Sequence, residues 1–225
     1  MQPKSAYKNH SRWLRLVLAV VIIGITYAGG MKGATADVIR ADEHTTLGHV
    51  GGLGVYPDGI TLMDTIHSLA KYSAQHPPLY YLSANIWGTV FSYDSYIMRI
   101  LSLFWGILAV AVFYRFATDI GGTPTAFFAS SLLATSTLFL FYTHEMREYS
   151  ALMFWVMLVW MLYSRAIRRR TSLQGRDMFL LLVATTCAVY THYTTIFLLI
   201  PIGIYHLLFV PKTKAWWQVS VAVVG

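Results

Sequence analysis

The sequence predicts an all-α polytopic membrane protein that forms one transmembrane domain over residues 1–225. Apolar residues make up 56% of the chain and charged residues only 12%, whereas a soluble domain carries about 25% charged residues. The apolar residues gather in runs close to the roughly 20 residues that cross a bilayer. The net charge is +7, and its basic residues stand in short loops between these runs.

This composition excludes several classes of protein. A soluble chain this apolar would lack a polar surface. Basic proteins often bind nucleic acid, but basic loops between apolar runs indicate membrane topology instead. We therefore expect no nucleic-acid partner. The single cysteine, Cys187, excludes an internal disulfide and a structural thiolate metal cluster.

The apolar runs predict seven membrane spans. The first, 14–30, follows Lys4, Lys8, Arg12 and Arg15, which predicts a signal anchor with a cytoplasmic N-terminus. The next spans are predicted at 100–116, 124–142, 151–163, 178–190 and 195–210, and a seventh at 216–225, truncated by the end of the chain. Each is expected to be helical, because backbone groups in lipid must be satisfied locally.

Residues 78–91 are apolar and aromatic but too short for a clear span. If they do not span, every strongly basic loop lies in the cytoplasm. If they do, the Arg168–Arg170 cluster moves outside, against the positive-inside rule. We therefore predict an interfacial helix at 78–91, within a long outer loop at 31–98.

This topology places most carboxylates and histidines on the non-cytoplasmic face. Asp42 and Glu43 come shortly after the first span. One of them could act as a general base, or the pair could bind a divalent cation. A solvated acidic pair in a loop is the alternative. We predict no metal site from His, Asp or Glu spacing within single helices.

His76 and Arg99 are candidates for contacts to a phosphate. His76 precedes Pro77 and Pro78, which cannot continue a helix and hold the histidine at a fixed turn. The alternative is an incidental histidine at a helix start. Arg99 opens the second span, where an arginine either pairs with a phosphate or extends to lipid headgroups.

The loop at 143–149 is the densest polar cluster between two spans. It contains Glu145, Arg147 and Tyr149. Ionisable residues at membrane depth are costly, so their presence indicates function. A surface ion pair of little energetic value is the alternative. His192 stands between tyrosines at the next outer boundary, which is typical of an aromatic belt and also allows substrate contact.

Five motifs in order resemble those of a known family. They are Asp42-Glu43, His76-Pro77-Pro78-Leu79-Tyr80-Tyr81-Leu82, Met98-Arg99-Ile100-Leu101-Ser102, Glu145-x-Arg147-x-Tyr149 and Tyr190-Thr191-His192-Tyr193. This order resembles the dolichyl-phosphate-mannose-protein mannosyltransferases and their bacterial relatives, including the aminoarabinose transferases that act on lipid A. The resemblance covers nearly the whole chain and implies a GT-C-like bundle of transmembrane helices.

The resemblance also implies roles at the matching positions. Asp42 would be the general base, and Glu43 would support it. His76 and Arg99 would contact the donor phosphate, while Glu145, Arg147 and Tyr149 form a second outer-loop site and His192 lines the cavity. The partners would be a polyprenyl-phosphate-linked sugar, membrane lipid, and an acceptor protein, lipid or glycan.

Family members are longer, so this chain corresponds to their N-terminal half. A missing C-terminal half or a partner subunit is therefore expected, and a non-catalytic GT-C-like subunit that binds lipid or partner proteins stays an alternative. A transporter fits less well, because the charged clusters stand at span ends rather than at the midplane. Compact cytoplasmic loops favour the plasma membrane of a prokaryote.

Overall fold

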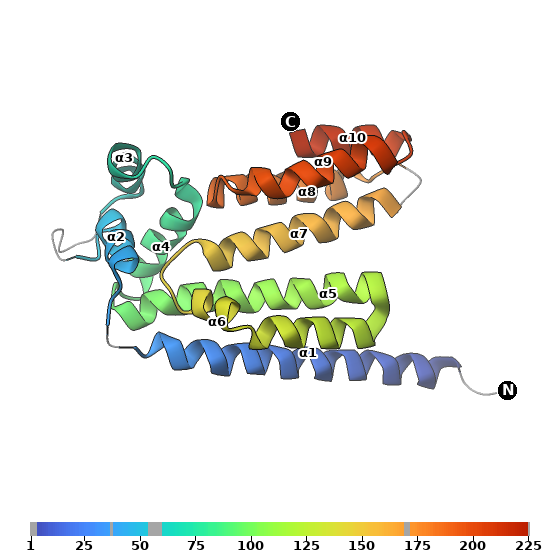
Figure 1. The fold of residues 1–225 in the computed structure, drawn as a ribbon, viewed down its shortest axis with the longest axis horizontal. Helices are drawn as coiled ribbons and strands as arrows, with labels where there is room; N and C mark the ends of the chain where they lie inside the picture. Colours follow the sequence, from blue (N-terminus) through green and yellow to red (C-terminus); the bar gives the residue numbers. More distant parts are fainter. Residues whose placement is uncertain (1–3, 37, 54–59, 169–171, 225) are drawn as a thin grey trace.

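The computed structural model describes residues 4–36, 38–53, 60–168 and 172–224, and the side chains of residues 13–223 within these ranges. Every regular element in them is a helix (Figure 1). The helices are α1 (Lys4–Ala34), α2 (Ala41–Val50), α3 (Leu62–Tyr72), α4 (Pro78–Val90), α5 (Ser95–Thr135), α6 (Thr137–Thr143), α7 (Tyr149–Arg168), α8 (Gly175–Thr191), α9 (Thr195–Phe209) and α10 (Lys214–Val224). The predicted fold class, an all-α polytopic membrane protein, is confirmed.

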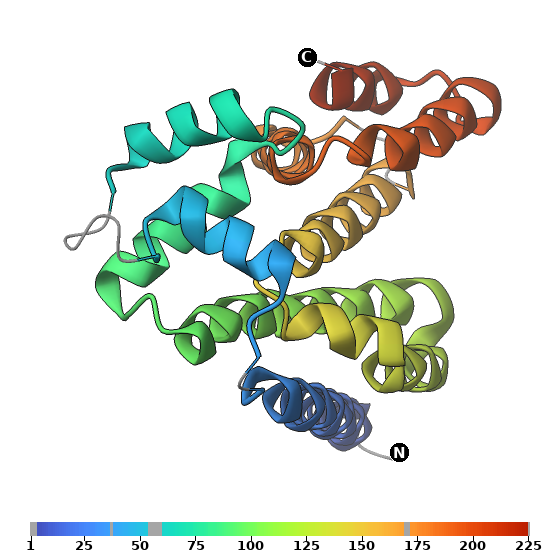
Figure 2. The ribbon, with the colours of Figure 1, turned by 60° about the vertical axis from the view of Figure 1, so that its left-hand side comes forward.

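The long helices lie side by side, and three shorter helices cover one end of them. Figures 1 and 2 show α2, α3 and α4 at the same end of the bundle, on the side away from the N-terminus. The connections 144–148 and 192–194 reach this end as well. We call it the capped end.

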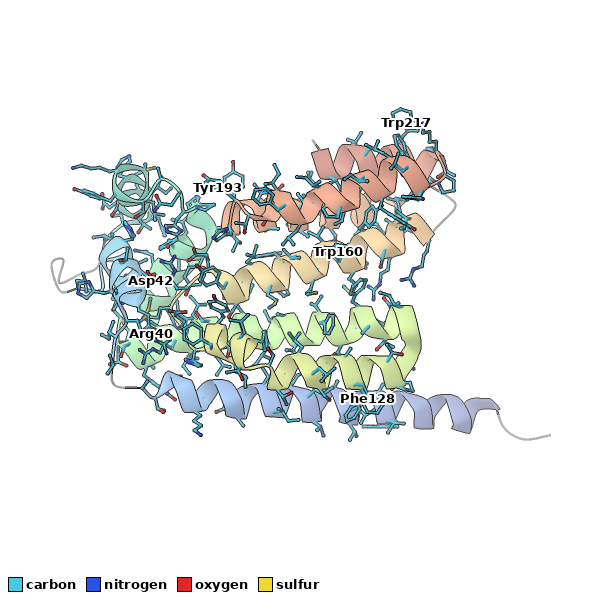
Figure 3. The ribbon with its side chains drawn as sticks, viewed as in Figure 1. Arg40, Asp42, Phe128, Trp160, Tyr193 and Trp217 are labelled. Carbon is cyan, nitrogen blue, oxygen red and sulfur yellow. The ribbon has the colours of Figure 1, made fainter. Side chains whose placement is uncertain are left out.

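In the part of the chain that the structure describes, three helices are long and apolar enough to cross a membrane: Trp13–Ala34 in α1, α5, and α7. Their outward side chains are large and apolar; Phe128 is 68% exposed and projects from the bundle in Figure 3. Water would solvate such a surface poorly, whereas hydrocarbon matches it. The outer surface of the bundle is therefore suited to lipid.

α5 is a helical hairpin rather than one rod. As a straight helix its 41 residues would be about 60 Å long, about twice the hydrocarbon core. Gly122 interrupts it with a φ of 79°, a left-handed conformation that glycine adopts at low cost. Pro124 then opens the return arm, since proline is tolerated in a first helical turn. Figure 1 shows the chain turning back at the end opposite α4.

The helix over the predicted span 124–142 has one break. Ser136 ends α5 and caps α6 by accepting a hydrogen bond from the Phe139 amide. Serine at such a position competes for backbone donors and so favours a break. The expected spans 14–30, 100–116, 151–163 and 178–190 lie within α1, α5, α7 and α8.

The last two predicted spans correspond to shorter helices. α9 ends at Phe209, one residue before the expected 195–210, and α10 covers 216–224 of the expected 216–225. Gly225 lies outside the described residues, as do 37 and 54–59 of the outer loop. The membrane crossing of α8, α9 and α10 stays a prediction.

α4 lies across the capped end, over residues close to the predicted 78–91. A helix at headgroup level would be expected to turn its tyrosines outward. In the structure, Tyr80 and Tyr81 are instead buried. The Tyr80 hydroxyl lies 2.9 Å from Ser102 Oγ on α5, because a buried phenol needs a polar partner. Asn85 Nδ2 donates to the carbonyl of Ile60 at 2.7 Å. α4 is thus the platform that joins the outer loop to the bundle.

Basic side chains gather at the opposite end, around Asp119. Arg165 Nε donates to its carboxylate at 2.6 Å, and Arg115 Nε lies 3.4 Å from it. Arg168 donates to the Asp119 backbone carbonyl at 2.6 Å. We call this the arginine end. The cytoplasmic location of this end stays a prediction.

Candidate functional site

Glu43 and Arg99 form a buried ion pair at the capped end. Arg99 Nε and Nη2 donate to the two carboxylate oxygens at 2.8 and 2.7 Å. The other N–H groups of Arg99 donate to the backbone carbonyls of Ala34, Ala36 and Val38. A guanidinium has five N–H donors, so all are used. Arg99 therefore fastens the chain between α1 and α2, and in this structure it offers no donor to the phosphate predicted for it.

The Glu43 carboxylate also accepts hydrogen bonds from two backbone amides. Its Oε2 accepts the Arg40 amide at 3.0 Å and its Oε1 the Met146 amide at 3.2 Å. Burial acts to raise the pKa of Glu43, but the hydrogen bonds from Arg99 and these two amides lower it below its ordinary value. Glu43 is therefore a fixed anion that ties α2 to the loop after α6.

Asp42 is the free member of the acidic pair. It is exposed in the first turn of α2, because one residue turns the helix by about 100° away from the buried Glu43. No ion pair or hydrogen bond to its carboxylate is found among the described residues. Asp42 is close enough to Glu145 to raise the pKa of that carboxyl. Figure 3 shows Asp42 and Arg40 together at the capped end.

Glu145 is buried with a weak partner. Its Oε1 lies 3.9 Å from Arg40 Nη1, and the Arg40 guanidinium also lies over the Phe141 ring, 4.4 Å from its centroid. Burial is the main cause that raises the pKa of Glu145. The nearby anions Glu43 and Asp42 raise it further. This carboxyl is therefore held less firmly than Glu43.

Glu148 is the centre of a second cluster. It is fully buried, and His76 Nδ1 lies 3.1 Å from Oε1. Arg147 Nε is 3.4 Å from Oε2, and His192 Nε2 is 3.8 Å from Oε1. The Tyr81 hydroxyl donates to Oε2 at 3.5 Å. Burial acts to raise the pKa of Glu148, but the contacts from His76 and Arg147 lower it.

Tyr149 and His192 complete this cluster. The Tyr149 ring lies 5.9 Å from the His192 ring and 5.8 Å from the Arg147 guanidinium. His192 Nδ1 accepts the Thr194 amide at 3.2 Å. Burial lowers the pKa of His192, although Glu148 acts against this. The ring is therefore held between the start of α7 and the start of α9.

The predicted site residues fall into two adjoining groups at the capped end. Asp42, Glu43, Arg99 and Glu145 form the first, while His76, Arg147, Tyr149 and His192 form the second around Glu148. The loop 144–148 joins the groups, because Met146 contacts Glu43 while Glu148 contacts His76. The sequence prediction did not include Arg40, Tyr81 or Glu148. For Glu148, the excess of ionisable groups in one short loop was the available signal.

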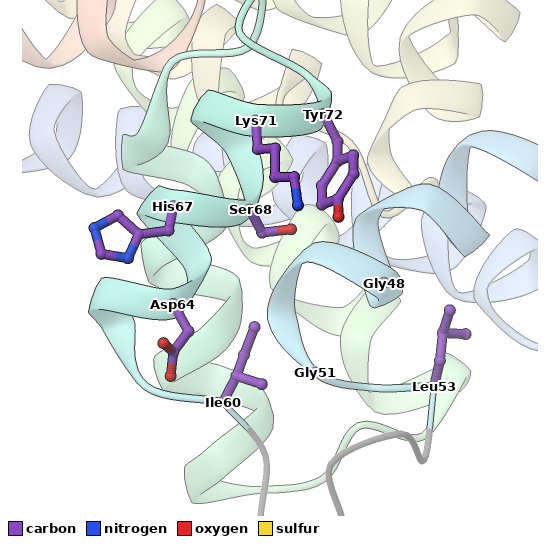
Figure 4. A pocket seen from close by; sticks show the side chains of 9 residues that line it. All are labelled: Gly48, Gly51, Leu53, Ile60, Asp64, His67, Ser68, Lys71 and Tyr72. Atoms are coloured by element: carbon purple, nitrogen blue, oxygen red, sulfur yellow. The ribbon is translucent and has the colours of Figure 1, made fainter.

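No group of three or more His, Cys, Asp or Glu side chains that could hold a metal ion occurs in the described part of the chain. A cavity of about 480 Å³ lies between α2 and α3 (Figure 4). The Lys71, Ser68 and Tyr72 side chains point into it. None of the predicted site residues lines the cavity, which is bordered by Leu53 and Ile60 at the ends of a stretch outside the described residues.

A bundle of lipid-matched helices with ionisable residues clustered at one end defines a membrane protein with a polar site at one end of its helix bundle. The model of the dolichyl-phosphate-mannose-protein mannosyltransferase family matches residues 75–225. The chain belongs to this family of membrane glycosyltransferases. Nothing among curated proteins or solved structures matches the chain. The matched segment includes the entire Glu148 cluster and Arg99, while Asp42 and Glu43 precede it.

Proposed function

We propose that the protein transfers a sugar from a polyprenyl-phosphate donor to an acceptor hydroxyl at the capped end, on the non-cytoplasmic face. Membership in the family supports the transferase activity. The polar clusters lie where helices that match lipid meet the outer cap, so a lipid-linked donor can keep its tail in the bilayer while its headgroup reaches them. The plasma membrane of a prokaryote is part of this proposal.

The main support for this proposal is the difference between the surroundings of Asp42 and Glu43. Glu43 is buried and bonded to Arg99 and two backbone amides, so the backbone of the first turn of α2 is held in place. Asp42 is adjacent to it, exposed, and free of side-chain partners among the described residues. A general base needs a fixed position and an accessible carboxylate, and Asp42 has both.

The leaving phosphate needs cationic partners. We assign this role to His76 and Arg147. Arg147 Nη2 donates to Glu148 at 3.4 Å. Its buried Nε forms an ion pair with Glu148 but no hydrogen bond in the described part of the chain. A guanidinium with fewer hydrogen bonds is a better phosphate ligand than Arg99, whose N–H groups are all occupied.

The step we propose is a single displacement. Asp42 takes the proton of the acceptor hydroxyl as its oxygen bonds to the anomeric carbon. The bond from that carbon to the phosphate oxygen breaks, and the phosphate leaves with the electron pair. The configuration at the anomeric carbon inverts. The acceptor, whether protein, lipid or glycan, approaches from the side of α2.

The test measures the rate at which the Asp42→Asn variant, in proteoliposomes, transfers sugar from polyprenyl-phosphate sugars to hydroxyl acceptors. We expect a loss of turnover by a factor of about 100 or more with an unchanged melting temperature, because Asp42 has no structural partner. Asp64→Asn, in the first turn of α3, is the control and should retain activity. Full turnover in Asp42→Asn would remove the proposed base.

A further inference from the structure

We propose that Glu148 is a positioning residue for the donor phosphate: it holds His76 through Nδ1 and leaves Nε2 as the atom that meets the phosphate. This inference rests on the proposed function. In it, the Glu148 carboxylate does not touch the substrate and acts on the same site through His76.

Glu148 is placed to organise the cluster. It is fully buried, and its partners come from separate segments: His76 from the turn before α4, Tyr81 from α4, and His192 from the end of α8. Tyr81 is 67 positions from Glu148. A buried carboxylate without partners would be costly, so these contacts hold the three segments together.

The contact with Glu148 favours one state of the His76 ring. His76 Nδ1 lies 3.1 Å from Glu148 Oε1 as an ion-pair contact, although its N–H is not aligned for a hydrogen bond in the described part of the chain. An ionised carboxylate only accepts hydrogen bonds, so a proton on Nδ1 is favoured beside it. The same arrangement orients histidines whose other nitrogen binds a ligand. No bond to His76 Nε2 is found among the described residues. That nitrogen is available, and it donates a hydrogen bond when the ring is protonated.

His192 provides a contrast within the same cluster. Its Nδ1 accepts the Thr194 amide, so the proton of the neutral ring is on Nε2, which faces Glu148. Both ring nitrogens of His192 are therefore engaged inside the protein. His76 is the histidine of this cluster that keeps a nitrogen for a ligand.

The backbone around His76 reinforces this orientation. The His76 amide donates to the Ser73 carbonyl at 2.9 Å, and Pro77 and Pro78 restrict the chain that follows. The His76 and Tyr81 rings lie 5.8 Å apart. With the backbone and one ring face held, the contact to Glu148 decides the rotation of the imidazole.

Charge balance favours an anion at this place. Among the described residues, the charged or titratable groups that face Glu148 or His76 include Arg147, His192, His49, Tyr80 and Tyr81. The negative charge of Glu148 offsets that of Arg147, so protonation of His76 leaves the cluster with a net positive charge. A phosphate monoester would be bound by that excess.

The test is a double-mutant cycle with polyprenyl phosphate as the probe, bound to the full chain in nanodiscs. The variants are Glu148→Gln, His76→Gln and the double variant. We expect each single change to weaken binding about tenfold, as for loss of one charge-assisted hydrogen bond. The double variant should bind no worse than either single one, because Glu148 acts through His76. Asp119→Asn, which removes a carboxylate at the arginine end, is the control with unchanged affinity.

A conservative variant separates positioning from a merely structural role. Glu148→Asp keeps a carboxylate for His76 and should bind polyprenyl phosphate more tightly than Glu148→Gln, although glutamine matches the size of glutamate better. If Glu148→Gln does not fold, Glu148→Asp is compared with His76→Gln and should lose less affinity.

Three outcomes would overturn the inference: native affinity in a folded Glu148→Gln variant, additive losses in the cycle, or a loss of affinity in Glu148→Asp as large as that in Glu148→Gln or His76→Gln. These leave the proposed function intact if the native protein still transfers sugar. Absence of polyprenyl-phosphate binding by the native protein would overturn both.

Discussion

Glu43 and Arg99 are 56 positions apart in the sequence, yet both oxygens of the carboxylate accept hydrogen bonds from the guanidinium, at 2.8 and 2.7 Å. Both side chains are buried. The pair connects α2 to the start of α5, and the remaining donors of Arg99 hold the chain that leaves α1. The position of Asp42 above the bundle therefore depends on this contact.

Breaking this pair should destabilise the protein strongly. Glu43→Gln leaves Arg99 buried without its anion, which costs about 3–5 kcal/mol when a buried pair loses one partner. The measurement is thermal unfolding in detergent. Arg115→Gln is the control, since the Arg115 side chain is 59% exposed and exposed pairs contribute about 0–1 kcal/mol. Equal effects of the two changes would contradict a stabilising role for the buried Glu43–Arg99 ion pair.

Arg147 and Arg99 should respond differently to replacement by lysine. Lysine keeps the charge but loses the planar, forked donor geometry. Arg99→Lys should lower the melting temperature, because several backbone carbonyls lose their donors. Arg147→Lys should mainly weaken polyprenyl-phosphate binding, by about tenfold. Melting temperature and polyprenyl-phosphate affinity should be measured for both variants. If Arg99→Lys mainly weakened binding and Arg147→Lys mainly lowered the melting temperature, the roles assigned to the two arginines would be wrong.

Glu145 and Glu148 should show opposite pH effects on stability. The folded pKa of Glu148 is lowered by His76 and Arg147 against the effect of burial, so its contribution is present above the ordinary glutamate pKa and is lost as the pH falls through the folded value. Glu148→Gln should therefore destabilise most at neutral pH.

The folded pKa of Glu145 is raised, chiefly by burial. Its contribution is complete below the ordinary value and is lost as the pH rises through the folded one. Glu145→Gln should thus be at least as stable as the native protein near neutral pH, with the difference vanishing in acid. Melting temperatures from about pH 4 to about pH 8 test both signs, and parallel curves for the two variants would refute the assignment.

Two glycines of α1 provide a matched test of how closely the first helix packs at the capped end. A Cβ at Gly33 would lie 2.2–2.4 Å from ring atoms of His144, whereas one at Gly24 would meet nothing within 4 Å. Gly33→Ala should cost about 1–3 kcal/mol by overpacking and reduce transfer, because His144 adjoins Glu145. Gly24→Ala should change stability by less than about 1 kcal/mol. Unfolding and turnover should be measured for both variants; the same result for both would contradict close packing at Gly33.

The helices were predictable because their signals are local. The apolar run that became α7 and the proline pair at the start of α4 determine structure over a few residues. The break at Ser136 was not foreseen, because apolar residues continue on both sides of it. The burial of Tyr80 and Tyr81 was also missed, since aromatic residues suit both a headgroup surface and a buried platform.

The sequence alone determined that this is a helical membrane protein of the mannosyltransferase family, because run length, apolarity and motif order are properties of the chain itself. Only the tertiary structure decided which polar residues are free. Arg99 is fully bonded, Asp42 is exposed, and Glu148 joins two histidines. The physical reason is that a buried side chain takes its hydrogen-bond partners from segments distant in sequence, and no local pattern specifies those partners.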